Sequence, residues 1–78
     1  MQTTTNAIRE TGTVKWFNNS KGYGFIVHPT QGDVFVYYLD IMGEGFKTLR
    51  PLQQVEFTLL DRGRGLAAAD VTAYETFQ

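Results

Sequence analysis

Apolar residues along the chain fall into short runs, and within most runs they alternate with polar residues or glycine. The runs are rich in Val, Phe, Tyr, Trp and Ile, and segments containing Gly, Pro, Asn and Asp separate them, which is typical of a small β-sandwich or barrel. No window keeps a helical apolar period for long enough to predict a helix, apart from the ambiguous run 66–69. We therefore predict five strands, over residues 12–18, 23–28, 33–38, 55–60 and 66–74.

The segments between these runs predict how the strands connect. Residues 18–22 contain two Asn and a Gly that can take positive φ, so they predict a turn between the first two strands. The loop 29–33 is short enough for a hairpin, so the first three strands should form a meander. The longer segment 39–53 should cross the barrel. Because no helix covers them, the five strands must close on themselves to hide their edges, and the predicted fold class is an all-β barrel.

Length and composition limit how the chain is organised. Its 78 residues predict a single domain with one modest core. Residues 1–9 are polar and threonine-rich, so we expect a flexible tail rather than a signal sequence or a membrane span. The expected domain follows at residues 10–74, with a second tail at 75–78. The lack of cysteine excludes disulfides and thiolate metal sites, and it fits the reducing cytoplasm, where we expect the protein.

Charge limits the kind of partner. The formal net charge is −1 and the sequence pI is about 5.6, which disfavours a protein that binds nucleic acid mainly by neutralising phosphates. Residues 1–28 contain three basic residues and one acidic residue, whereas residues 29–78 contain four basic and seven acidic residues. A nucleic-acid site should therefore depend on rings more than on charge, and its affinity should change only weakly with salt.

Aromatic residues are concentrated in one part of the chain, because eight of the eleven lie between residues 16 and 46. Alternation along the second and third predicted strands turns aliphatic residues inward and aromatic residues outward. The outward set is Tyr23, Phe25, Phe35 and Tyr37. Cross-strand neighbours lie about 5 Å apart, so these rings should form one contiguous surface.

The first strand can widen this surface. Both of its faces look apolar, so we predict a β-bulge near Trp16, whose ring would join the other rings. Lys15 and Lys21 lie beside the rings in the sequence. Exposed rings among lysines indicate a surface that stacks the bases of single-stranded nucleic acid.

Other interpretations stay open at this point. The rings could pack on one another and complete a small core, or the aromatic surface could bind extended peptides or a second copy of the chain. An enzyme is disfavoured, because His28 is the only histidine, there is no cysteine nucleophile and the acidic residues are scattered. We expect His28, next to Pro29, to be a hairpin residue. We also expect no metal site and no cofactor.

Three motifs carry a more specific signal: Gly12-Thr13-Val14-Lys15-Trp16-Phe17-Asn18, Lys21-Gly22-Tyr23-Gly24-Phe25-Ile26 and Asp33-Val34-Phe35-Val36. Together they resemble the bacterial cold-shock proteins, and the resemblance covers about residues 11–73. It implies a five-stranded antiparallel oligonucleotide/oligosaccharide-binding (OB) barrel that binds single-stranded RNA and DNA. It also implies an RNA chaperone or transcription antiterminator. We expect a mild preference for pyrimidine-rich strands, since these lose less self-stacking on binding.

The resemblance also implies roles for individual residues. The stacking face would comprise Lys15, Trp16, Phe17, Tyr23, Phe25, Phe35, Tyr37, Tyr38 and Phe46. Polar and phosphate contacts would come from Asn18, Lys21 and Arg64, with Arg62 as a nearby reserve.

Some positions depart from the family pattern. Tyr37 replaces the usual histidine and Tyr38 the usual phenylalanine, which keeps stacking area but removes a titratable group. Leu39, Leu52 and Leu66 stand where a small residue, a turn glycine and a proline are common. We expect a monomer, with a dimer made by exchanging strands across residues 39–53 as the alternative.

Overall fold

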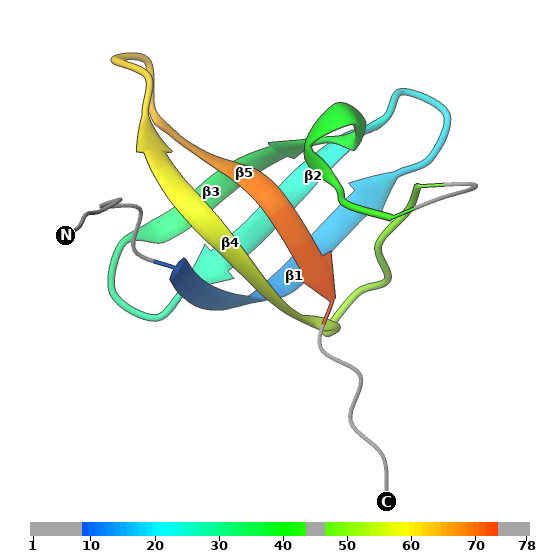
Figure 1. The fold of residues 1–78 in the computed structure, drawn as a ribbon, viewed down its shortest axis with the longest axis horizontal. Coiled ribbons are helices and arrows are strands. Elements are labelled where there is room, and N and C mark those ends of the chain that lie inside the picture. Colours follow the sequence, from blue (N-terminus) through cyan, green and yellow to red (C-terminus); the bar gives the residue numbers. More distant parts are fainter. Residues whose placement is uncertain (1–8, 44–46, 74–78) are drawn as a thin grey trace, which may run out of the picture.

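In residues 9–43 and 47–73, which the computed structural model describes, five strands form a closed barrel (Figure 1). The elements are β1 (Arg9–Asn18), β2 (Tyr23–His28), β3 (Gly32–Tyr37), the 3₁₀ turn η1 (Tyr38–Asp40), β4 (Gln54–Asp61) and β5 (Leu66–Ala73). Their order around the barrel is β1-β2-β3-β5-β4, and β4 pairs with β1 to close it. The predicted all-β class, the meander of the first three strands and the closure are confirmed.

Most strand pairs are antiparallel, as predicted. The exception is β3 with β5, where a parallel bridge joins Phe35 to Ala67. The crossing segment runs from β5 to β1, since Ile41 bridges Val71 and the backbone N–H of Leu52 donates to the carbonyl of Val14 at 2.8 Å. Within the described ranges, no helix is long and apolar enough to cross a membrane.

The strand boundaries differ from the prediction where tertiary contacts decide them. β1 begins at Arg9 rather than Gly12, because the Arg9 guanidinium donates to Thr58 Oγ1 on β4 (3.1 Å) and Thr72 Oγ1 on β5 (3.2 Å). Arg9, the last residue of the predicted tail, therefore lies in the barrel. β3 ends at Tyr37, and the predicted strand residue Tyr38 begins η1 instead. The rest of both predicted tails, and the end of the fifth predicted strand, lie outside the described residues.

The core follows from the alternation of side chains along the strands. Its fully buried large side chains are Val14, Ile26, Val34, Val36, Val55, Phe57 and Val71. Ile26 on β2 and Val34 and Val36 on β3 face inward, as predicted, which leaves the aromatic residues of these two strands outside together with Val27.

His28 holds the turn between β2 and β3, as expected for a hairpin residue. Its Nδ1 accepts the backbone N–H groups of Thr30 and Gln31, both at 3.1 Å. Because Nδ1 is an acceptor, Nε2 carries the hydrogen and donates it to Glu10 Oε1 at 2.7 Å. The ring is buried and lies edge-on to Phe57. This histidine therefore links β1 to the hairpin.

Leu52 lies in a strained turn before β4, and we expect Leu52→Gly to stabilise the protein. Its φ is 70° and its side chain is 79% exposed. The left-handed conformation costs a residue other than glycine about 1–2 kcal/mol, whereas glycine adds unfolded-chain entropy of about 0.5–1 kcal/mol. The expected net gain, about 0.5–1 kcal/mol, is measured by urea unfolding.

The matched control is Leu52→Ala. This variant removes the exposed apolar side chain but keeps the strain, so it should not gain stability. Equal stability of the glycine and alanine variants would contradict the strain at this position.

Candidate nucleic-acid interface

A bulge in β1 turns both Lys15 and Trp16 outward. Val14 pairs with Ile26 on β2, and Trp16 pairs with the preceding Phe25, so Lys15 is an extra residue on β1. Without the extra residue, alternation would place Trp16 on the same side as the buried Val14. The bulge reverses the alternation, and Trp16 shares a face with Phe25. The irregularity predicted near Trp16 is confirmed.

Four rings from β1, β2 and β3 form a contiguous cluster, here called the aromatic platform: Trp16, Tyr23, Phe25 and Phe35. The centroid of the Trp16 ring lies 5.5 Å from that of Tyr23 and 5.4 Å from that of Phe25. Phe35 lies 5.7 Å from both Tyr23 and Phe25. Trp16 and Phe35 are 38% and 37% exposed, so the platform presents ring surface to solvent.

A tyrosine pair extends the aromatic surface beyond the platform. Tyr37 lies opposite Tyr23, and its ring centroid is 5.0 Å from that of Tyr38 in η1. The backbone N–H of Tyr38 donates to the carbonyl of Gly22 at 2.8 Å. Gly22 has a φ of 78°, and a Cβ there would lie 2.8 Å from the Tyr38 ring. The glycine is therefore needed both for the turn and for the close approach of the ring.

One residue predicted for the stacking face packs elsewhere, and another lies outside the described residues. Phe17 is only partly exposed and packs against the hydrophobic core, because the bulge turns it inward as it turns Trp16 outward. The structure does not bring Phe17 together with the platform rings. Phe46 lies outside the described residues.

The predicted polar residues have distinct surroundings. Lys15 Nζ lies 3.0 Å from Asp33 Oδ2, so an acidic side chain already neutralises this lysine. Asn18 Oδ1 accepts the backbone N–H of Lys21 at 2.8 Å, which closes the turn between β1 and β2. Arg64 lies in the exposed loop between β4 and β5. Of these groups, Lys15 and Asn18 are therefore already engaged within the fold.

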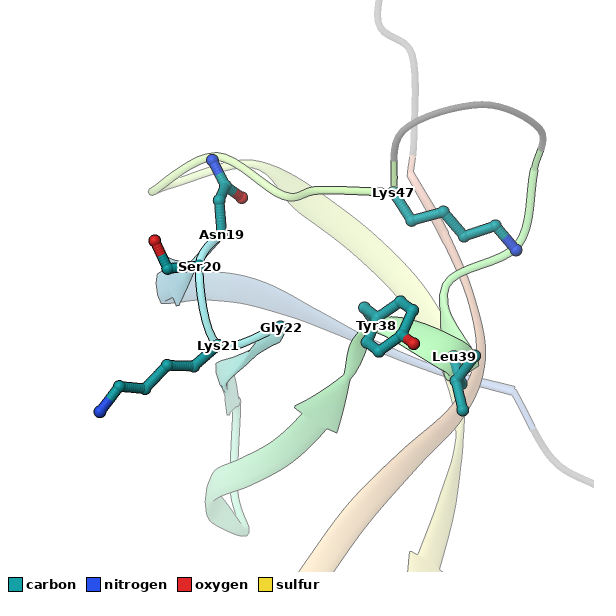
Figure 2. Close-up of a pocket in the computed structure, with 7 residues that line it drawn as sticks. All are labelled: Asn19, Ser20, Lys21, Gly22, Tyr38, Leu39 and Lys47. Atoms are coloured by element: carbon teal, nitrogen blue, oxygen red, sulfur yellow. The ribbon is translucent and has the colours of Figure 1, made fainter.

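Two hollows adjoin the aromatic surface. The first, of about 460 Å³, lies between the β1–β2 turn and η1 and is lined by Lys21, Tyr38 and Lys47 (Figure 2). The second, also about 460 Å³, lies beside Phe35 at the β3–β5 seam, where Arg62 and Arg64 line it. Side-chain alternation does not mark Lys47 as a site residue, because Lys47 lies in the crossing segment rather than in a strand.

The chemistry available here is stacking, hydrogen bonding and charge. Within the described residues, no group of three or more His, Asp or Glu side chains could hold a metal ion. His28 is engaged in the hairpin turn, and the aromatic surface itself carries tyrosine hydroxyls, lysines and arginines. These groups suit reversible binding of a planar, anionic ligand.

Comparison with known proteins identifies the family. The family model described as the 'Cold-shock' DNA-binding domain matches residues 10–74, which is most of the chain. The chain belongs to the cold-shock domain family. Its members are nucleic-acid-binding proteins rather than enzymes, so the expectation that the chain is not an enzyme is confirmed.

Similar cold-shock domain proteins come from several bacteria. The chain is 52% identical over 63 residues to the cold shock-like protein CspD of Bacillus cereus, a match that covers 81% of the chain and 96% of that protein. It is 55% identical over 60 residues to the cold shock protein CspB of Bacillus caldolyticus, covering 77% and 91%. It is 56% identical over 64 residues to the cold shock-like protein CspC of Escherichia coli K12, covering 80% and 91%.

A solved structure supports the fold of this cold-shock domain. The structure titled drosophila Unr CSD456 superimposes with a TM-score of 0.75 at 21% sequence identity. The superposition covers 94% of this chain and 30% of that longer chain. The predicted OB-type barrel is confirmed.

Proposed function

We propose that this cold-shock domain protein binds single-stranded RNA and DNA by stacking bases on the aromatic platform and on Tyr37 and Tyr38. The observation that supports this most is the contiguity of the four platform rings, which three neighbouring strands carry on one exposed face. Each stacked base contributes about 1–3 kcal/mol. A few rings therefore reach useful affinity with few phosphate contacts.

Binding of this kind would change RNA structure by mass action. Bases in a duplex are already stacked, so the protein would favour open strands and shift weakly paired RNA toward them without ATP. This is the physical basis for the proposed RNA chaperone or antiterminator role in the cytoplasm. Pyrimidine-rich strands should bind somewhat better, because they are more flexible and lose less self-stacking.

Trp16 provides the test, because it is the only tryptophan and belongs to the platform. Its fluorescence is followed during titration with an oligothymidine, the matched oligouridine and a duplex, each at two salt concentrations. The proposal expects quenching by both single strands, weak binding of the duplex and a small salt dependence. Unchanged fluorescence with every nucleic acid would overturn it.

A competing use of the same face is binding of a peptide or of a second copy of the chain. Base stacking requires this face to be free of a second copy of the chain, and we propose that the protein is a monomer. Size-exclusion chromatography coupled to light scattering tests this. A dimer that dissociates when oligothymidine is added would place the face in the dimer interface, whereas a dimer that binds nucleic acid unchanged would use another surface.

Binding should change little between about pH 5.5 and 8. Histidine is the side chain that ordinarily titrates in this range, and the only histidine is engaged in the β2–β3 turn rather than on the aromatic surface. The measurement is the dissociation constant of oligothymidine at several pH values and constant ionic strength, with circular dichroism to confirm folding. A tenfold change in affinity would show that a titrating group contributes to binding.

A further inference from the structure

The only histidine of the chain lies where β1 begins and β2 ends, apart from the aromatic surface. The His28 side chain is 9% exposed, and the Glu10 side chain that it contacts is 29% exposed. Figure 1 shows the β2–β3 turn beside the start of β1, where these two side chains meet. The ring is therefore buried in the barrel although it belongs to a turn at the surface.

The residues after His28 explain why its ring organises this turn. Pro29 has no backbone N–H, so the first donors that follow are those of Thr30 and Gln31. Both donate to Nδ1 at 3.1 Å, and the Thr30 hydroxyl lies 3.4 Å from the same atom. Gly32 then leads into β3 with a φ of 86°. One acceptor atom therefore receives both of the first backbone donors of the turn.

The two ring nitrogens respond differently to a proton. Protonated histidine donates from both nitrogens and accepts at neither. Nε2 already donates to Glu10 Oε1 at 2.7 Å, so this bond is kept and becomes a bond between opposite charges. At Nδ1 the added hydrogen faces the N–H hydrogens of Thr30 and Gln31, so both of these bonds are lost. Protonation therefore keeps the link to β1 and breaks the link to the turn.

No second charged group competes for the ring among the described residues. Glu10 on β1 contacts it, and β4 presents the apolar ring of Phe57 to it. The other charged side chains on β1, β3 and β4 have partners of their own: Arg9 pairs with Glu56, Lys15 pairs with Asp33, and Asp61 accepts the backbone N–H of Gly63. The state of the turn therefore follows the protonation of His28.

We infer that His28 is a proton-operated switch of the β2–β3 turn, which is closed when the ring is neutral and opens on mild acidification. In the open state the ring stays attached to β1 through Glu10, and the segment 29–31 is released from it. The change is confined to the turn, because β2 and β3 also pair through Val27 and Asp33 and the residues that follow. The platform therefore keeps its geometry, in agreement with the weak pH dependence expected for nucleic-acid binding. The switch belongs to the free protein and does not depend on the proposed function.

Nuclear magnetic resonance of the ¹⁵N-labelled full chain between about pH 8 and 5, where histidine ordinarily titrates, tests the switch. At the upper end, the ring nitrogens should show a neutral ring with its hydrogen on Nε2. As the ring takes up a proton, the amide signals of Thr30 and Gln31 should shift with the same midpoint. Their protection from hydrogen exchange, corrected for intrinsic rates, should fall about 2- to 12-fold, as expected for the loss of one hydrogen bond each.

Two variants of His28 provide matched controls. His28→Asn places a side-chain oxygen that can accept the same N–H groups and does not titrate, so its turn should stay closed throughout. Glu10 is retained in this variant, so a transition caused by its carboxylate would remain visible. His28→Phe keeps an aromatic ring without an acceptor, so its turn amides should resemble those of the protonated wild type at every pH. Circular dichroism shows whether each variant is folded.

The titration of the wild-type protein decides the inference, whether or not the variants fold. The switch is wrong if the ring takes up its proton while the signals of Thr30 and Gln31 stay unchanged. It is equally wrong if the ring stays neutral down to about pH 5, or if the neutral ring carries its hydrogen on Nδ1. The same transition in His28→Asn would assign it to another group.

Discussion

Replacing Phe35 with alanine should weaken the binding of single-stranded oligonucleotides about 5- to 150-fold and leave the barrel folded. Phe35 contacts two other platform rings and is 37% exposed, so much of its surface faces the proposed ligand. Loss of a stacked base removes about 1–3 kcal/mol of binding free energy. Loss of its two ring contacts should cost the fold about 1–3 kcal/mol, at about 0.5–1.5 kcal/mol for each aromatic pair.

Fluorescence titration with Trp16 measures the affinity, and thermal unfolding measures the effect on the fold. Phe35→Leu separates stacking from simple apolar contact, because leucine keeps apolar area but has no ring face. Its affinity should lie close to that of the alanine variant. Leu52→Ala is the control, since it removes an exposed apolar side chain outside the aromatic surface. Equal affinities of Phe35→Ala and the wild type would exclude the platform as the binding face.

Side-chain alternation made much of the fold predictable. Strands β2 and β3 have regular period-2 patterns, so the burial of Ile26, Val34 and Val36 could be read from the sequence. The irregularity in β5 could not be predicted from the sequence. There, Thr58 pairs with Ala69 and Glu56 with Thr72, so β5 has an extra residue, and Asp70 takes a φ of 51°. The register with β4 sets this bulge, and the alanine run before Asp70 carries no pattern that would reveal it.

The pattern of the sequence does not predict the start of η1, for a similar reason. Tyr38 continues the aromatic alternation of β3, so the sequence extends the strand through it. In the structure the carbonyl of Tyr38 accepts the backbone N–H of Ile41 at 3.1 Å, and Ile41 pairs with Val71 on β5. Contacts between residues far apart in the sequence therefore end the strand at Tyr37.

The candidate site was predictable where it depends on regular strands. The rings on β2 and β3 follow directly from alternation, and the apolar character of both faces of β1 pointed to the bulge that exposes Trp16. The same bulge turns Phe17 toward the core, which the motif resemblance does not indicate. The pairing of Lys15 with Asp33 depends on the positions of two strands relative to each other, so it could be found only in three dimensions.

The largest effect on stability should come from Gly24→Ala, which we expect to unfold the protein. Gly24 lies on β2 opposite Phe17 of β1. An alanine Cβ there would overlap the carbonyl oxygen of Trp16 and lie 2.7 Å from the Cα of Phe17. These are backbone atoms of a paired strand, so the overlap is relieved only if β1 and β2 separate. A core of this size supplies about 3–5 kcal/mol, which loss of this pairing should exceed.

Circular dichroism and the fluorescence of Trp16 measure this loss of structure, and Gly63→Ala is the matched control. Gly63 lies in the β4–β5 loop with a φ of 83°, and beyond its neighbours in the chain no atom lies within 4 Å of a Cβ placed there. The control therefore carries only backbone strain, about 1–2 kcal/mol, and should stay folded. If both variants lost the same stability, the close approach of β1 and β2 behind the platform would be wrong. Since this approach places Trp16 beside Phe25, the unfolding of Gly24→Ala should also abolish nucleic-acid binding, whereas Gly63→Ala should retain it.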